Sequence, residues 1–182
     1  MKNFILISKI ALLPLVCITF VYFFKIYIDF QFIITFSFLI VIFNKDKTKH
    51  HFSLSFLYSI LLSFLVLFLS MGVGKIIYII KDELFINLLS IDFLKRLHMI
   101  PKSIVSPLLM FYSYTLLFKM KKTNYFKLVK WSSVFVLILL GSTNLFFSNK
   151  SLFISWQFVM ALSLQLILYQ DEIKVLVKKN RI

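Results

Sequence analysis

The side chains with the most chemical potential gather in residues 81–101, which read KDELFINLLSIDFLKRLHMIP in an otherwise apolar chain. Carboxylates and an imidazole, the groups that enzymes use for general acid and base catalysis, stand here as Asp82, Glu83, Asp92 and His98. On a helix, the adjacent Asp82 and Glu83 would project about 100° apart, and His98 would lie about four turns further on. The spacing therefore does not favour a catalytic pair.

An amphipathic helical pattern fits this segment better. Steps of three and four residues separate the apolar side chains Ile77, Ile80, Leu84, Leu88 and Ile91. Because the charged residues that follow lie on another face, we expect two short helices over 75–101, with a break near Ser90, lying on the outer membrane surface. The alternative is a docking surface for a partner protein, formed by Asp82, Glu83, Asp92, Lys95, Arg96 and His98.

The composition indicates that lipid surrounds most of the chain. Of its 182 residues, 60% are hydrophobic and only 15% are charged, against about 25% in soluble domains. A soluble protein of this size has too little interior to hide so much apolar surface. The one cysteine, Cys17, cannot form an intrachain disulfide or a thiolate zinc site, so we predict a small buried residue there and no metal or cofactor.

Six apolar stretches of about 17–21 residues are long enough to cross a bilayer as helices. They cover residues 4–24, 26–43, 53–73, 103–119, 131–148 and 151–170. The first is not expected to be a cleaved signal peptide, because no small-x-small cleavage site follows it. The sequence thus predicts an all-α membrane protein: one domain, 1–182, built as a bundle of six transmembrane helices.

The basic residues predict how this bundle is oriented. Most of the 21 Lys and Arg fall in segments that six alternating spans place on one side: the N-terminus, 44–52, 119–130 and the tail after 170. Because basic loops stay inside, both termini are predicted to be cytoplasmic in the cell inner (plasma) membrane. The net charge of +14 then reflects loops that set topology and bind anionic lipids, with no nucleic-acid partner.

Two sets of polar residues lie within the predicted spans. Ser55, Ser59 and Ser63 repeat every four residues, so they share one face of the third span. Asn144, Gln157 and Gln165 are the most polar groups of the last two spans, and such amides must face the bundle interior. Both sets are predicted to pack helices together, and lining a substrate pathway is the alternative.

Catalytic signatures are absent from the sequence. There is no His-Glu-x-x-His motif and no nucleophile elbow, and no Asp or Glu lies deep within a span. Carriers coupled to protons or sodium usually rely on such intramembrane carboxylates. We therefore predict that the protein is not an enzyme and is not an autonomous ion-coupled transporter.

One stretch has a counterpart in a known family. Residues 92–119, DFLKRLHMIPKSIVSPLLMFYSYTLLFK, resemble part of the transmembrane subunit of energy-coupling-factor importers of vitamins and metals. In that family a leucine-rich amphipathic turn ends in a Leu/Ile-Pro step and runs into a further helix. The arginines of the family's ATPase-coupling helices have no counterpart in the lysine-rich 119–130 link. The resemblance implies a small-molecule-binding or transmembrane subunit of such an importer.

Three functions follow from these observations. The first is a non-enzymatic subunit of a larger membrane assembly for transport, secretion or envelope biogenesis, with other membrane-protein subunits as partners. The second is the importer subunit that the resemblance implies. The third is a membrane-embedded enzyme that modifies lipid or envelope components with the carboxylates and His98 of the outer segment.

A reporter fusion tests the predicted orientation. Alkaline phosphatase fused after Ile182 should be inactive, because its disulfides do not form in the cytoplasm. The same enzyme inserted between 85 and 100 should be active. Activity after Ile182 in intact cells would contradict the topology.

Overall fold

The computed structural model describes residues 2–23, 29–84, 101–142 and 149–179. Within these ranges the chain is 91% helical and forms no strand, which confirms the predicted all-α class. The only strand-like pairing in the described chain is an isolated bridge between Thr48 and Phe118.

The described elements follow one another along the chain. In order, the elements are α1 (Lys2–Phe23), α2 (Asp29–Phe43), the 3₁₀ turn η1 (Lys45–Lys47), α3 (Phe52–Leu84), the π turn η2 (Pro101–Val105), α5 (Ser106–Leu117), α6 (Asn124–Ser142), α7 (Asn149–Leu168) and α8 (Gln170–Lys179).

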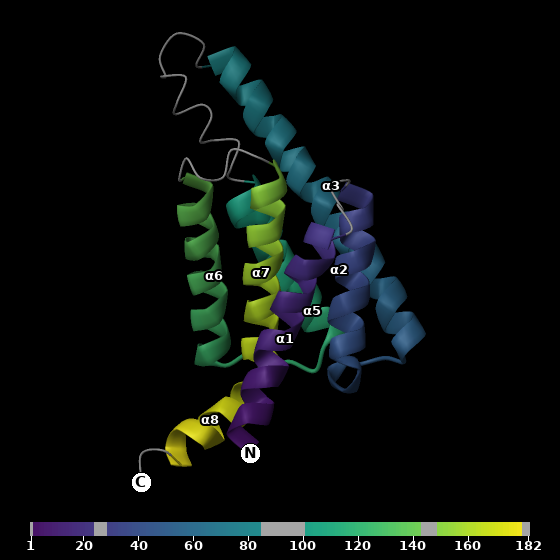
Figure 1. The fold of residues 1–182 in the computed structure, drawn as a ribbon. Helices are drawn as coiled ribbons and strands as arrows, with labels where there is room; N and C mark the ends of the chain where they lie inside the picture. The colour runs from purple at the N-terminus through teal and green to yellow at the C-terminus, as the bar shows by residue number, and fades with distance from the viewer. Residues whose placement is uncertain (1, 24–28, 85–100, 143–148, 180–182) are drawn as a thin grey trace.

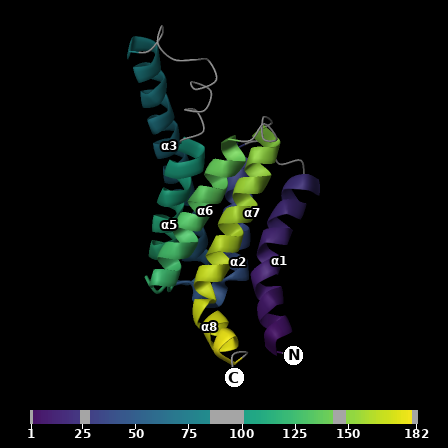
Figure 2. The same ribbon diagram turned by 90° about the vertical axis from the view of Figure 1, so that its left-hand side faces the viewer.

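The helices pack into an elongated bundle (Figures 1 and 2). Helix α7 contacts α1 on one side and α6 on the other, while α3 contacts α2 and α5. Both termini lie at one end of the bundle, the lower end in Figure 1, together with the connections between α2 and α3 and between α5 and α6. We call this the basic end, because these are the lysine-rich segments of the sequence.

Several helices have the length and composition of membrane spans. Phe4–Phe23, Phe52–Ile77 and Asn124–Gly141 are long and apolar enough to cross a bilayer, and three shorter apolar helices cover Ile33–Phe43, Ser103–Leu117 and Ile154–Leu168. Each predicted span overlaps one of these six helices. The structure is therefore compatible with a helical membrane protein, and a count of six crossings stays a prediction.

Helix α3 corrects the predicted boundary between the third span and the outer segment. The sequence predicts that the span ends at 73 and that a separate surface helix begins at 75, but α3 continues as one helix through Leu84. No proline interrupts the sequence between Phe52 and Leu84, so nothing breaks the ladder of backbone hydrogen bonds. The predicted break near Ser90 lies outside the described residues.

Helix α6 begins earlier than the predicted fifth span, and the tail after 170, for which no structure was predicted, is also helical. The basic link predicted over 119–130 is helical from Asn124 onward, because the Thr123 side chain accepts a hydrogen bond from the backbone N–H of Phe126 at 3.3 Å and caps the helix. The tail after 170 forms α8, whose first turn carries Asp171 and Glu172, and carboxylates are favourable near a helix N-terminus.

Apolar side chains occupy the interior of the bundle and much of its surface. Phe36, Phe111, Tyr114 and Phe118 are each at most 1% exposed. On α3, in contrast, only 17% of the residues in the most apolar 18-residue stretch are buried. This helix therefore presents a largely apolar outer face.

Candidate functional site

The serines predicted on one face of the third span are all buried in the structure. Ser55, Ser59 and Ser63 lie on the inner side of α3, with exposures of 0%, 2% and 6%. The Ser63 hydroxyl is hydrogen-bonded to the Ser37 hydroxyl of α2 at 3.2 Å, and Ser55 donates to the carbonyl of His50 at 3.0 Å. This face of α3 therefore makes helix contacts.

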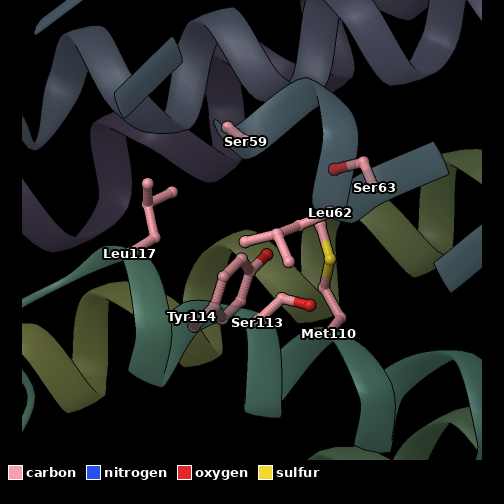
Figure 3. Close-up of a pocket in the computed structure, with 7 residues that line it drawn as sticks. All are labelled: Ser59, Leu62, Ser63, Met110, Ser113, Tyr114 and Leu117. Carbon is pink, nitrogen blue, oxygen red and sulfur yellow. The ribbon is translucent and has the colours of Figure 1, made fainter. Parts of the chain in front are cut away.

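A small cavity lies between α3 and α5. Its volume is about 10 Å³, and it is lined by Ser59, Leu62, Ser63, Met110, Ser113, Tyr114 and Leu117 (Figure 3). Ligand pockets for organic molecules have volumes of about 300 Å³ or more, so this space is the size of a single water molecule.

Gln165 joins two helices that are distant in the sequence. Its Nε2 donates to the Asn44 side-chain oxygen at 3.2 Å, and the Asn44 Nδ2 donates in turn to the carbonyl of Ile40 at 2.9 Å. Asn44 was missed by the sequence analysis, which assigned it to the basic link. Its position directly after a long apolar run is the sequence signal that could have identified Asn44 as a buried polar residue.

Gln157 lies two turns before Gln165 on α7 and is fully buried. Neither its Nε2 nor its Oε1 has a hydrogen-bond partner among the described residues. A buried amide without partners costs stability, because it gives up its hydrogen bonds with water and gains none in return. The Gln165 Oε1 also has no partner among the described residues, so the two glutamines differ only in the bond from the Gln165 Nε2 to Asn44.

A second pair of serines connects α6 and α7. The hydroxyls of Ser133 and Ser163 lie in hydrogen-bond contact, and both residues are at most 5% exposed. The sequence analysis did not single them out, although each is a small polar residue inside an apolar span.

Most of the predicted outer partner surface is outside the described chain. Asp92, Lys95, Arg96 and His98 fall in 85–100, and Asn144 falls in 143–148. Asp82 and Glu83 belong to the last turn of α3. The predictions for these residues are therefore not tested by the structure.

The two basic loops are held against each other at the basic end. The backbone N–H of Lys49 donates to the carbonyl of Leu117 at 3.0 Å, and that of Lys119 donates to the carbonyl of Lys47 at 2.8 Å. The Lys49 ammonium donates to the carbonyl of Thr115 at 2.6 Å.

Helix α8 is fastened to these loops by two ion pairs. The Lys47 ammonium lies 3.0 Å from a Glu172 carboxylate oxygen, and the Lys121 ammonium lies 2.7 Å from one of Asp171. We call these two pairs the α8 clasp. The hydrogen bond from Lys121 lowers the pKa of Asp171, and Asp171 raises the pKa of Lys121 in turn. The sequence analysis missed the clasp because these carboxylates were counted only as part of a basic tail.

Other contacts support the same junction. The Tyr169 ring lies beneath the Lys47 ammonium, 5.0 Å from ring centroid to nitrogen, and the Lys9 ammonium of α1 is 5.9 Å away. The Gln170 side chain donates to the carbonyl of Lys121 at 3.1 Å and accepts a hydrogen bond from Thr123. Residues 169–172 therefore tie α1 and both basic loops to the start of α8.

Within the described chain, no cluster of three His, Cys, Asp or Glu side chains could hold a metal ion. No protein-family model matches the chain, and no curated protein or solved structure is significantly similar to it. The function therefore has to be argued from the contacts described above, and the importer resemblance of 92–119 stays a prediction from the sequence.

Opposite stability changes are expected for the two glutamines of α7. Gln157→Leu should raise the free energy of unfolding by about 1–3 kcal/mol, because it removes a buried amide without partners. Gln165→Leu should lower it by at most about 1 kcal/mol, because the buried Asn44 oxygen loses its donor, and removal of the unpartnered Gln165 Oε1 offsets part of that loss. Thermal unfolding can be followed with a thiol-reactive dye, since Cys17 is 0% exposed and reacts only after unfolding. A loss of stability in Gln157→Leu would show that the amide has a partner.

The α8 clasp should respond to pH only at the extremes. Because the folded pKa of Asp171 is lowered, its contribution to stability is present above its unfolded pKa of about 4 and is lost as pH falls through the folded value. For Lys121 the folded pKa is raised, so the dependence on pH is reversed. The contribution of Lys121 to stability is present below about pH 10 and is lost as pH rises through its folded pKa.

Asp171→Asn should accordingly lower the melting temperature by about 1–3 °C between pH 5 and 9, as expected for an exposed ion pair, and by less toward pH 3. Circular dichroism measures this difference. The matched control is Asp46→Asn, because the exposed Asp46 carboxylate forms no ion pair within the described chain. A difference between wild type and Asp171→Asn that does not shrink as the pH falls from 5 toward 3 would contradict the clasp.

Proposed function

We propose that the protein is a non-enzymatic subunit of a larger assembly in the cell inner membrane, serving transport, secretion or envelope biogenesis. The observation that carries this proposal is the length and exposure of α3. Its 33 residues span about 50 Å, well over the ~30 Å of bilayer hydrocarbon. Figures 1 and 2 both show its C-terminal end extending past the other described helices.

The extending part of α3 carries exposed apolar side chains. Ile76 is 57% exposed and Ile79 is 53% exposed. From Phe52 to Ile79 the helix rises about 40 Å, so holding both residues within ~30 Å of hydrocarbon would need a tilt of about 40°, the upper end of the range for membrane helices. An apolar side chain beyond the hydrocarbon is stabilised when another protein covers it, so a partner subunit is favoured at this end of α3.

The interior of the bundle supports the same function. Its polar side chains connect helices in pairs, as in Ser37–Ser63, Asn44–Gln165 and Ser133–Ser163. The cavity between α3 and α5 is too small for a vitamin or a lipid head group. These features favour a scaffold over a carrier that binds substrate in its core.

The grouping of the basic segments supports the orientation. The N-terminus, both basic loops and α8 lie at one end of the bundle (Figure 1). A cytoplasmic location for this end satisfies the preference of Lys and Arg for the inside, and it leaves the extending end of α3 outside.

Site-specific photo-crosslinking tests the proposed partner contact. A benzophenone amino acid at position 79 should yield a protein adduct in intact cells. The control position is Phe135 on α6, which is 60% exposed in the middle of an apolar span and should face lipid. Ile79→Lys should also release the crosslinked protein from the complex purified in mild detergent, with an unchanged melting temperature. A free monomer without an adduct at position 79 would refute the proposal.

A further inference from the structure

We propose that the cavity between α3 and α5 binds one ordered water molecule, which joins the hydroxyl of Ser59 to the hydroxyl of Tyr114. The cavity volume of about 10 Å³ is close to the smallest space that holds a water molecule. A buried water also needs two to four polar partners, and the lining supplies hydroxyl groups from both helices.

Two of these hydroxyl groups need a partner. Ser59 is 2% exposed and Tyr114 is 1% exposed, and both line the cavity. Neither the Ser59 Oγ nor the Tyr114 Oη makes a hydrogen bond with the described residues. Leaving two hydroxyls unpaired in an apolar interior is costly, and a water molecule between them can accept a hydrogen bond from each.

The other two hydroxyls can accept hydrogen bonds from the same water. The Ser113 hydroxyl donates to the carbonyl of Leu109 at 3.0 Å, and the Ser63 hydroxyl is bonded to Ser37. Each of these oxygens keeps a lone pair. Figure 3 shows Ser63 on α3 and Ser113 and Tyr114 on α5 facing the space between the two helices. The water then accepts from Ser59 and Tyr114 and donates to Ser63 and Ser113.

Other occupants fit less well. No carboxylate lines the cavity to balance a bound cation, and the space is too small for an organic ligand. The site lies near the basic end, since Tyr114 is one turn from the end of α5 and Ser59 is two turns from the start of α3.

A double-mutant cycle tests the bridge. If water links the two hydroxyls, Ser59→Ala and Tyr114→Phe should each lower the melting temperature by about 2–4 °C. The double variant should lose little more than either single variant, because the second change acts on a bridge that is already broken. The exposed Ser132→Ala and Tyr112→Phe are matched controls that should leave the melting temperature unchanged.

If the hydroxyls are simply unpaired, their removal should stabilise the protein. A rise in melting temperature for either single variant, or two losses that add in the double variant, would therefore overturn the proposal.

Radiolytic footprinting gives an independent measurement on the unmodified chain. X-rays generate hydroxyl radicals from bound water, and these oxidise the methionine that lies beside it. Met110 lines the cavity and is 3% exposed, whereas Met160 is fully buried and is not part of the lining. We expect Met110 to be oxidised several-fold faster than Met160, and the difference to vanish in Ser59→Val, which fills the cavity. Equal oxidation of the two methionines in the wild type would overturn the proposal.

Discussion

Apolar side chains cover the outer faces of the bundle as well as its interior, and this limits the forces that can hold the helices together. Leu61, Phe68 and Phe135 are each more than half exposed on the outer faces of α3 and α6. In lipid, burying such residues gains little, because lipid tails are as apolar as the side chains. Close packing and hydrogen bonds must then hold the helices together.

Serine supplies much of that packing in this chain. The sequence has only 3 Gly, so serines are the small residues that let helix backbones approach. The pair Ser37–Ser63 joins α2 to α3, and the pair Ser133–Ser163 joins α6 to α7. The amide contact between Asn44 and Gln165 then connects these two halves. These polar residues within apolar helices are therefore structural contacts, and among the described residues the hydroxyls of Ser59 and Tyr114 are left without a partner.

The lysines at the basic end have two roles. Because many basic residues cluster at this end of the bundle, a cytoplasmic location is favoured, and this preference depends on their total number rather than on any single lysine. Lys47 and Lys121 also make specific contacts with the carboxylates of α8, and Lys49 bonds to the backbone of α5. These ion pairs leave the net charge of +14 unchanged, because that figure already subtracts every Asp and Glu.

Local composition and helical periodicity were enough to predict the helical class, the apolar stretches and the inward face of Ser55, Ser59 and Ser63. The pairing of the polar groups depends instead on how distant segments pack. Asn44 and Gln165 are 121 residues apart, and Lys47 and Glu172 are 125 apart, so no local pattern predicts these contacts. Local patterns also failed to predict two features of the helix ends. Lysines of distant loops hold the start of α8 in place. Helix α3 continues to Leu84, although its charge pattern suggested an earlier end. Local periodicity predicts which face of a helix is buried, and the packing of distant segments selects its partner.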